Sequence, residues 1–197
     1  MKRFMARAHR RPPGPWVLLG LLIPLLGSPS SDYLSIKRKF DLIESDKLRP
    51  GSRVTLTSRE LNAFVVNEVA EFDGQGVRDP KLELGNDSAT GTALIDFLKL
   101  RQAAGKPSGW VMTKLLAGER PVRVTARIKS GSGRAVVDVE RVEISGVTID
   151  GKMLDYLIQH YLIPQFPEAK VGQPFELAHH IDRLEVTPDA VGVVLGR

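Results

Sequence analysis

The stretch LTSRELNAFVVNEVAEF (56–72) contains the clearest helix start in the chain. Thr57 precedes Glu60 by three residues, the spacing of a capping box, in which a hydroxyl and a carboxylate satisfy the first free amides of a helix. Leu56 and Leu61 flank this start at the spacing of a hydrophobic staple. The pattern therefore predicts a helix over this stretch. Its apolar residues recur at three- and four-residue steps and should share one face: Leu61, Phe64, Val65, Val69 and Phe72.

The length of 197 residues suits one domain of ordinary size with an N-terminal extension. An apolar fraction of 42% is sufficient for a hydrophobic core. The chain has no cysteine. This excludes disulfide bonds, thiolate metal sites, a cysteine nucleophile and a lipid-modified cysteine anchor.

The net charge of +5 comes entirely from the N-terminus. Residues 1–30 hold five of the 28 basic residues and no acidic residue, which leaves 23 residues of each sign in the rest of the chain. A basic chain indicates nucleic-acid binding when the charge lies on the folded domain, and here it does not. We therefore expect no nucleic-acid partner.

Residues 1–30 have the three parts of a secretory signal peptide. A cationic region (1–15) is followed by the apolar run WVLLGLLIPLL (16–26) and by small residues that suit cleavage before Ser31. The apolar run is too short to span a bilayer, which needs about 20 residues. We predict a cleaved signal, with an uncleaved N-terminal anchor as the alternative. Either would place the protein in a bacterial periplasm or cell envelope.

The next segments predict one more helix and a long strand. Residues 31–50 form an N-terminal helical segment in this prediction, because Ile36, Phe40 and Ile43 recur at helical spacing. Residues 90–100 predict a strand that is apolar on both faces. Such a strand lies in mid-core or turns one face toward something outside the chain.

Two β-hairpins follow from alternation and turn residues. Residues 121–129 alternate strictly between apolar and polar, and the turn SGSG leads into a returning strand over 134–149. The apolar phase of that strand shifts near Glu140-Arg141, which predicts a bulge. A second hairpin is predicted over 181–195.

Residues 151–166 predict a second amphipathic helix, with Asp150 as its cap. Its apolar residues come as pairs, so the apolar stripe is broader than a half-buried helix needs. Two arrangements are open: the two helices pack on each other over the sheet and close the core, or an apolar groove lies between them. The paired residues are Met153, Leu154, Leu157, Ile158, Tyr161 and Leu162.

Residues 101–120 interrupt the sheet pattern and contain lysines, a tryptophan and leucines. This combination is typical of a segment that docks on an anionic membrane surface. The alternative is a short helix that plugs one end of the sheet. Residues 99–134 hold nine basic residues and one acid, which predicts a cationic sheet edge. The candidate docking residues are Lys106, Trp110, Val111, Lys114, Leu115 and Leu116.

No motif in the chain indicates catalysis. His160 and the pair His179-His180 lack the spacing of zinc ligands, and adjacent histidines on a strand would point to opposite faces. Ser108 does not stand in a G-x-S-x-G motif. We therefore predict no enzyme activity, no metal site and no cofactor.

The order of elements predicts an α+β domain with an antiparallel sheet. Within it, two motifs carry a family resemblance: G-x-x-V-x-L-T-x-x-E-L-N (51–62) and V-x-I-S-G-V-x-I-D-G (142–151). With the leader and the terminal hairpin, the region 51–197 resembles exported bacterial LmeA-like and YpmS-like proteins, which are related to tubular lipid-binding (TULIP) folds. The resemblance implies a curved antiparallel sheet wrapped on the helices 57–72 and 151–166, with an apolar groove for acyl chains.

The hypothesis from the sequence is an exported envelope protein that binds or transfers a lipid and contacts an anionic membrane peripherally. The alternative is a non-enzymatic scaffold or interaction module with a closed core and an unknown protein partner. The candidate lipid-binding residues are Leu61, Phe64, Val65, Val69, Phe72, Met153, Leu154, Leu157, Ile158 and Tyr161.

Overall fold

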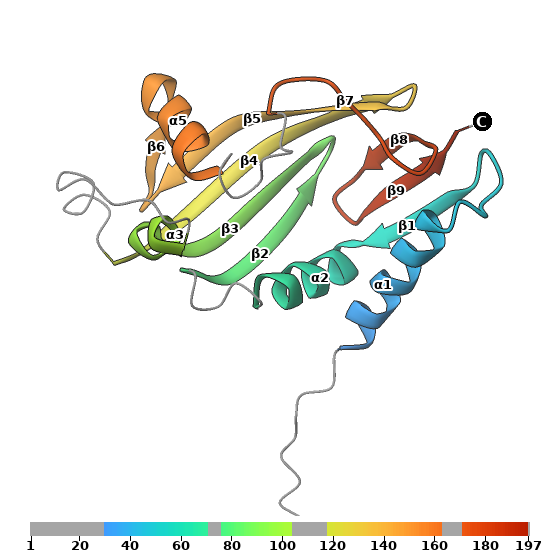
Figure 1. Ribbon diagram of the computed structural model, residues 1–197, viewed down its shortest axis with the longest axis horizontal. Helices are drawn as coiled ribbons and strands as arrows, with labels where there is room; N and C mark the ends of the chain where they lie inside the picture. Colours follow the sequence, from blue (N-terminus) through green and yellow to red (C-terminus); the bar gives the residue numbers. More distant parts are fainter. Residues whose placement is uncertain (1–29, 71–75, 104–117, 163–170, 197) are drawn as a thin grey trace, which may run out of the picture.

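The strands form two antiparallel sheets (Figure 1). The computed structural model describes residues 30–70, 76–103, 118–162 and 171–196. The smaller sheet contains, in spatial order, β1 (Arg53–Thr57), β9 (Ala190–Leu195) and β8 (Ile181–Val186). The larger sheet contains β2 (Val77–Gly85), β3 (Ser88–Asp96), β4 (Glu119–Gly131), β5 (Arg134–Ile144) and β6 (Val147–Ile149), and β7 (Phe175–Glu176) pairs with the start of β5.

The predicted α+β class with antiparallel strands is confirmed, but we had expected one continuous sheet. The two sheets are instead joined by a few hydrogen bonds to β8. The Ser130 hydroxyl donates to the Leu184 carbonyl (2.9 Å) and accepts from the Leu184 amide (2.8 Å), and the Gly133 and Asp87 amides donate to the Asp182 (2.9 Å) and Val186 (3.1 Å) carbonyls. Helix α2 (Ser58–Ala70) follows β1 directly, so it lies between β1 of the smaller sheet and β2 of the larger sheet in the chain.

The long strands of the larger sheet bend along their length (Figure 1). One cause is a bulge in β5: Thr125 pairs with Arg141 and Ala126 pairs with Val139, so Glu140 is skipped in the backbone register with β4. A bulge of this kind bends its strand and increases the local twist. The bulge predicted from the apolar phase shift is confirmed.

Four α-helices in the described part of the chain accompany the sheets. Helix α2 packs against α1 and β2, while α5 follows β6 at the opposite edge of the larger sheet (Figure 1). The helices are α1 (Ser31–Glu44), α2 (Ser58–Ala70), α3 (Phe97–Ala103) and α5 (Gly151–Leu157), which continues as the π-helix η1 (Ile158–Leu162).

A closed hydrophobic core lies between α1 and the smaller sheet. The helical spacing predicted for α1 is confirmed, since Ile36 and Ile43 are buried and Phe40 packs beside them. Leu61 and Phe64 of α2 also pack against this core. Its buried members are Ile36, Ile43, Val54, Leu56, Val193 and Leu195.

The predicted capping box is present at the start of α2. The Glu60 carboxylate accepts hydrogen bonds from the Thr57 amide (2.8 Å) and hydroxyl (3.0 Å), and the Glu60 amide donates to the Thr57 hydroxyl (3.3 Å). The same carboxylate also accepts from Ser35 and Lys39 of α1, each at 2.7 Å. It therefore ties together α1, the end of β1 and the start of α2.

Glu60 is 5% exposed, and these hydrogen-bond donors stabilise its ionised carboxylate. Burial by itself raises the pKa of this carboxyl, but the hydrogen bonds from Lys39, Ser35 and Thr57 outweigh burial. Together they lower the pKa of Glu60 from 4.5 to about 2. Glu60 therefore stabilises the fold in its ionised form.

Asn62 fixes α2 on the edge of the larger sheet. Its side-chain amide donates to the Leu82 carbonyl (2.6 Å), and its side-chain oxygen accepts from the Leu82 amide (2.8 Å). The side chain thus pairs with β2 as a neighbouring strand would. The motif over 51–62 therefore sets both the start of α2 and its position against the sheet.

The strand predicted over 90–100 is wrong at its end. β3 stops at Asp96, whose carboxylate accepts from the amides of Leu98 and Lys99 (both 3.1 Å) and caps α3. An aspartate in this position satisfies the first amides of a helix, which favours a turn over continued extension. The apolar residues after Asp96 therefore belong to a helix.

The second predicted helix is confirmed in part. It begins at Gly151 with Asp150 at the predicted N-cap position, where the Asp150 carbonyl accepts from the Leu154 amide (3.3 Å), but the Asp150 side chain makes no capping hydrogen bond. The α-helix gives way to a π-helical turn after Leu157, which widens the repeat. Residues 163–166 of the predicted helix lie outside the described residues.

Candidate functional site

An apolar pocket, which we call the inner pocket, lies between α2, α5 and the inner face of the larger sheet. Its volume of ≈ 510 Å³ lies within the range of about 300–1,000 Å³ that is usual for ligand sites. Among the described residues it is lined by Phe64, Val65, Glu68, Val69, Val77, Ile95, Phe97, Leu100, Val122, Val124, Val139, Val142, Ile144, Leu154, Leu157 and Ile158.

Strand alternation explains why the sheet side of the inner pocket is apolar. Successive side chains of a strand point to opposite faces. In β4, Val122 and Val124 point to the inner pocket, while Arg123 and Arg127 point to the outer face. The sheet therefore has an apolar inner face and a charged outer face.

The helices on the two sides of the inner pocket are held by different parts of the molecule. Helix α2 packs against α1 and β2, while α5 directly follows β6 at the far edge of the sheet. Side chains from both helices line the same pocket. Of the two arrangements left open by the sequence, the structure has the one with a space between the helices.

The structure brings six of the ten predicted lipid-binding residues to this space. Leu61 is not among the lining residues, because it packs against the closed core below α1. Phe72 and the side chain of Tyr161 lie outside the described residues. The six lining residues are Phe64, Val65, Val69, Leu154, Leu157 and Ile158.

The predicted position of Met153 is wrong. Its side chain is 52% exposed, and it does not line the inner pocket. Neighbouring residues of a helix differ by about 100° in direction. With Leu154 turned to the pocket, Met153 faces solvent. The part of the apolar stripe that lines the pocket is therefore narrower than the paired pattern suggested.

Sequence reasoning did not name the lining residues from the strands and from α3. The strict alternation of β4 was a usable signal for Val122 and Val124, once the apolar face is known to turn toward the helices. Phe97 and Leu100 were missed because Asp96 had not been recognised as a helix cap.

Glu68 is the one ionisable side chain among the described lining residues. Its carboxylate accepts a hydrogen bond from the Tyr33 hydroxyl of α1 (3.0 Å). Glu68 follows Phe64 by one helical turn, and the rings of Phe64 and Tyr33 are stacked with centroids 6.4 Å apart. The carboxylate therefore lies on the α1 side of the inner pocket.

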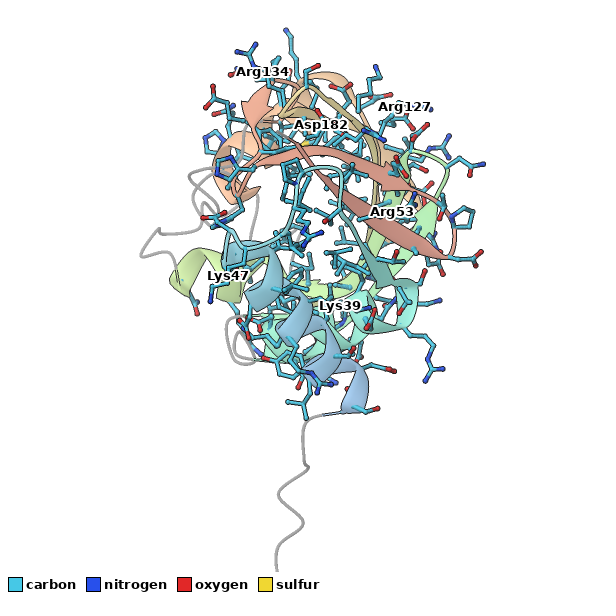
Figure 2. All side chains as sticks on the ribbon, turned by 90° about the vertical axis from the view of Figure 1, so that its right-hand side faces the viewer. Lys39, Lys47, Arg53, Arg127, Arg134 and Asp182 are labelled. Atoms are coloured by element: carbon cyan, nitrogen blue, oxygen red, sulfur yellow. The ribbon has the colours of Figure 1, made fainter. Side chains whose placement is uncertain are left out.

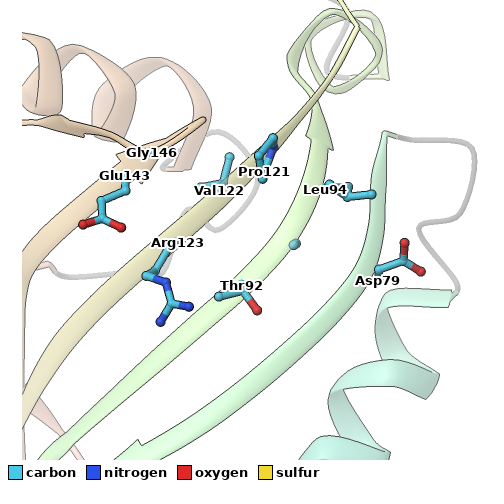
Figure 3. A pocket seen from close by; sticks show the side chains of 9 residues that line it. Asp79, Thr92, Leu94, Pro121, Val122, Arg123, Glu143 and Gly146 are labelled. Atoms are coloured by element: carbon cyan, nitrogen blue, oxygen red, sulfur yellow. The ribbon is translucent and has the colours of Figure 1, made fainter.

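A second pocket of ≈ 410 Å³, which we call the outer pocket, has a mixed polar and apolar lining and lies on the opposite face of the sheet. Figure 3 shows Arg123, Glu143 and Asp79 around it. Arg123 lies 3.7 Å from Glu83, and Glu143 lies 3.3 Å from Arg141. Two of its charged groups are therefore already paired within the protein.

Several basic residues of the predicted cationic sheet edge form ion pairs with carboxylates. Arg127 and Lys129 of β4 pair with Glu140 and Asp138 of β5, and Lys99 pairs with Asp96. Arg127 and Arg134 extend at the outside of the molecule (Figure 2). Segments of opposite charge in the sequence lie side by side in the sheet, so the local excess does not become a surface patch along β4.

The predicted docking residues lie outside the described residues, namely Lys106, Trp110, Val111, Lys114, Leu115 and Leu116. In the part of the chain that the structure describes, no helix is both long and apolar enough to cross a bilayer.

The histidine pair does not lie on a strand as predicted. His179 and His180 have positive φ angles of 53° and 56° in the loop before β8, and both are exposed. His179 Nδ1 lies 3.5 Å from a carboxylate oxygen of Asp46. Across the described ranges, no three acidic or histidine side chains gather as metal ligands.

Comparison with known proteins does not assign the chain to a family. No protein-family model matches it, and no curated protein matches it significantly. The resemblance to LmeA-like and YpmS-like proteins therefore stays a prediction.

Proposed function

We propose that this protein binds a lipid or another apolar chain in the inner pocket and belongs to the TULIP-like lipid binders of the bacterial envelope. The observation that carries the proposal is the apolar space of ≈ 510 Å³ that the described residues of α2, α5 and the sheet enclose. Removal of an acyl chain from water would supply on the order of 25 cal/mol per Å² of buried apolar surface.

The lining chemistry suits binding without a catalytic step. The described walls offer valine, isoleucine, leucine and phenylalanine side chains, with the Glu68 carboxylate at the α1 side. Such walls give an acyl chain many dispersion contacts and little directional recognition. We propose a carrier or binding protein and not an enzyme.

Export and peripheral membrane contact complete the proposal. They rest on the leader over residues 1–30 and on the basic, Trp-bearing segment that contains Lys106 and Trp110. A carrier of this kind would take up its ligand at an anionic membrane surface.

The alternative is a scaffold module with a closed core. That function predicts side chains that fill the space between the helices and the sheet. The inner pocket counts against it, and so do the internal ion pairs of the outer face, which leave fewer charged groups for a protein partner.

A pocket-filling variant tests the proposal. Val124→Trp places a large ring in the inner pocket, and Val147→Trp is its matched control, because Val147 is 62% exposed and lies outside the pocket lining. The neutral fluorescent probe N-phenyl-1-naphthylamine should bind the unchanged protein and the Val147 variant alike. Val124→Trp should lower probe affinity at least tenfold, while the circular dichroism spectrum stays unchanged. Equal probe binding by all three proteins, or binding by none, would contradict the proposal.

A further inference from the structure

In the described part of the chain, one arginine on the inner face of the larger sheet has a buried guanidinium nitrogen without a hydrogen bond. The Nε atom of Arg120 is buried and lacks a hydrogen bond, and among the described residues it is the one side-chain nitrogen or oxygen in this state. A guanidinium group keeps its charge at any pH that a protein tolerates. A buried donor without an acceptor is unfavourable, and its presence calls for an explanation.

The strand register places Arg120 beside lining residues at one end of the inner pocket, although Arg120 is not itself among the described lining residues. Arg120 has the same phase in β4 as Val122 and Val124, which line the pocket, and it is half-buried. Its cross-strand neighbour is Ile95 of β3, another lining residue. α3 begins two residues after Ile95 and adds Phe97 to the same end.

Arginines on the outer face of the same sheet form ion pairs with carboxylates. Arg123 and Arg127 of β4 have Glu83 and Glu140 as partners. Glu119, which directly precedes Arg120, points to the outer face, where it pairs with Arg78 at 3.0 Å. Among the described residues, the outer arginines therefore have carboxylate partners, and no carboxylate forms an ion pair with Arg120.

A guanidinium fork matches the two oxygens of a carboxylate or phosphate. We propose that the ligand of the inner pocket is an amphiphile with an oxyanion head, carboxylate or phosphate, which Arg120 binds while the acyl chain lies along the apolar walls. This inference rests on the proposed lipid-binding function and adds the class of head group.

The position of Glu68 favours the same orientation. It lies on α2, which packs against β2, and β2 is separated from β4 by β3. Two strand spacings amount to roughly 10 Å. An anionic head is therefore repelled from the Glu68 side and attracted to the Arg120 end.

Four amphiphiles with the same twelve-carbon chain test the head group: dodecanoate, dodecyl phosphate, dodecanol and dodecylammonium. Their affinities for the full chain are measured by displacement of N-phenyl-1-naphthylamine. Both oxyanions should bind about tenfold more tightly than dodecanol, since charge-assisted bidentate hydrogen bonds are the strong ones. Dodecylammonium should bind more weakly than dodecanol.

Arg120→Met and Arg123→Met form a matched pair on opposite faces of one strand. Arg120→Met should remove the preference for oxyanions, with about a tenfold loss for dodecanoate, while dodecanol affinity stays the same. It should leave the melting temperature of the ligand-free protein unchanged or higher, because a buried nitrogen without a hydrogen bond is removed. Arg123→Met should keep the oxyanion preference. If Arg120→Met does not fold, Arg120→Lys should show an intermediate loss, because lysine keeps the charge without the fork.

The outcomes separate this inference from the proposed function. Equal binding of dodecanoate and dodecanol, or an oxyanion preference that survives in Arg120→Met, would overturn the head-group assignment and leave the lipid pocket standing. Absence of binding by all four amphiphiles would overturn both. Inorganic phosphate should give no Arg120-dependent rise in melting temperature. A rise as large as that with dodecyl phosphate would show a free-anion site and overturn the lipid source of the anion.

Discussion

The two apolar regions of the molecule are built from similar residues but are filled differently. Between α1 and the smaller sheet, Ile36, Val54 and Val193 are buried against one another. Between α2, α5 and the larger sheet, a comparable set of aliphatic residues surrounds the inner pocket. The difference comes from helix placement: α1 lies directly on its sheet, whereas the helices of the second region border a space.

This comparison shows that an apolar face does not by itself identify a core. A helix closes a core when it packs along the apolar face it covers, and interiors packed in this way have few voids. α2 does not pack along the apolar face of the larger sheet, because Glu60 binds it to α1 and Asn62 binds it to the edge of β2. The capping motif thus positions one wall of the inner pocket.

The largest expected effect comes from the same substitution made in the two regions. Ile36→Ala should cost about 2–5 kcal/mol of unfolding free energy, because Ile36 is fully buried and leaves a cavity. Ile95→Ala should cost roughly 1–2 kcal/mol, because one side of Ile95 already faces a space and makes fewer contacts. Urea unfolding measures both. Equal losses would mean that the second region is packed like the first.

The next effect concerns the carboxylate that joins the two regions. With a pKa lowered from 4.5 to about 2, ionised Glu60 contributes about 3 kcal/mol of stability above pH 4.5. This contribution is lost as the pH falls from 4.5 toward 2, since the folded state must then take up a proton that the unfolded state already carries. Glu60→Gln should therefore be less stable at pH 7 by about this amount.

Unfolding free energies of both proteins, measured from pH 7 to pH 2, check this prediction. The difference between them should shrink as the pH falls and nearly vanish at pH 2. A difference that does not change with pH would show that Glu60 acts through its shape and not through its charge.

A smaller effect is expected from Asn62, which sets the distance between α2 and the sheet. Asn62→Ala should cost about 1–3 kcal/mol, because the amide and carbonyl of Leu82 lose their partners. Asn67→Ala is the matched control on the same helix, since Asn67 bonds to the Ala63 carbonyl one turn earlier (2.7 Å). The control should stay within about 0.5 kcal/mol. Hydrogen exchange should show faster opening of β2 in the Asn62 variant, and unchanged exchange would refute the role given to Asn62.

The smallest effect is expected from Met153, which faces solvent beside the inner pocket. Met153→Ser should change stability by less than about 0.5 kcal/mol and should leave probe binding unchanged. Leu154→Ser, one position further, should weaken probe binding because Leu154 lines the pocket. Comparable losses in both variants would show that the whole stripe of α5 takes part in binding.

Local chemistry made much of the fold predictable from the sequence. The capping box of Thr57 and Glu60, the apolar spacing of α1 and the bulge at Glu140 each depend on residues close together in the chain. The six correctly placed lining residues were predictable for the same reason, since helical periodicity alone sets which side chains share a face.

The remaining features depend on which segments meet in space. The basic run along β4 suggested a cationic edge, but its partners Glu83 and Glu140 come from β2 and β5. β3 ends where Asp96 caps α3. The alternation of the sequence does not show this, because the apolar residues after Asp96 also fit a continued strand. The isolation of Arg120 required the register of β4 against β3 and the direction of Glu119, neither of which is local.

The central claim is that the inner pocket holds a lipid in the cell. Native mass spectrometry of the protein purified without detergent tests it most directly, with solvent extraction of the same sample to recover any bound molecule. We predict a folded species heavier than the polypeptide, which returns to the polypeptide mass on denaturation and releases an acyl lipid. A ligand-free mass in every preparation, together with no binding of N-phenyl-1-naphthylamine, would contradict the claim.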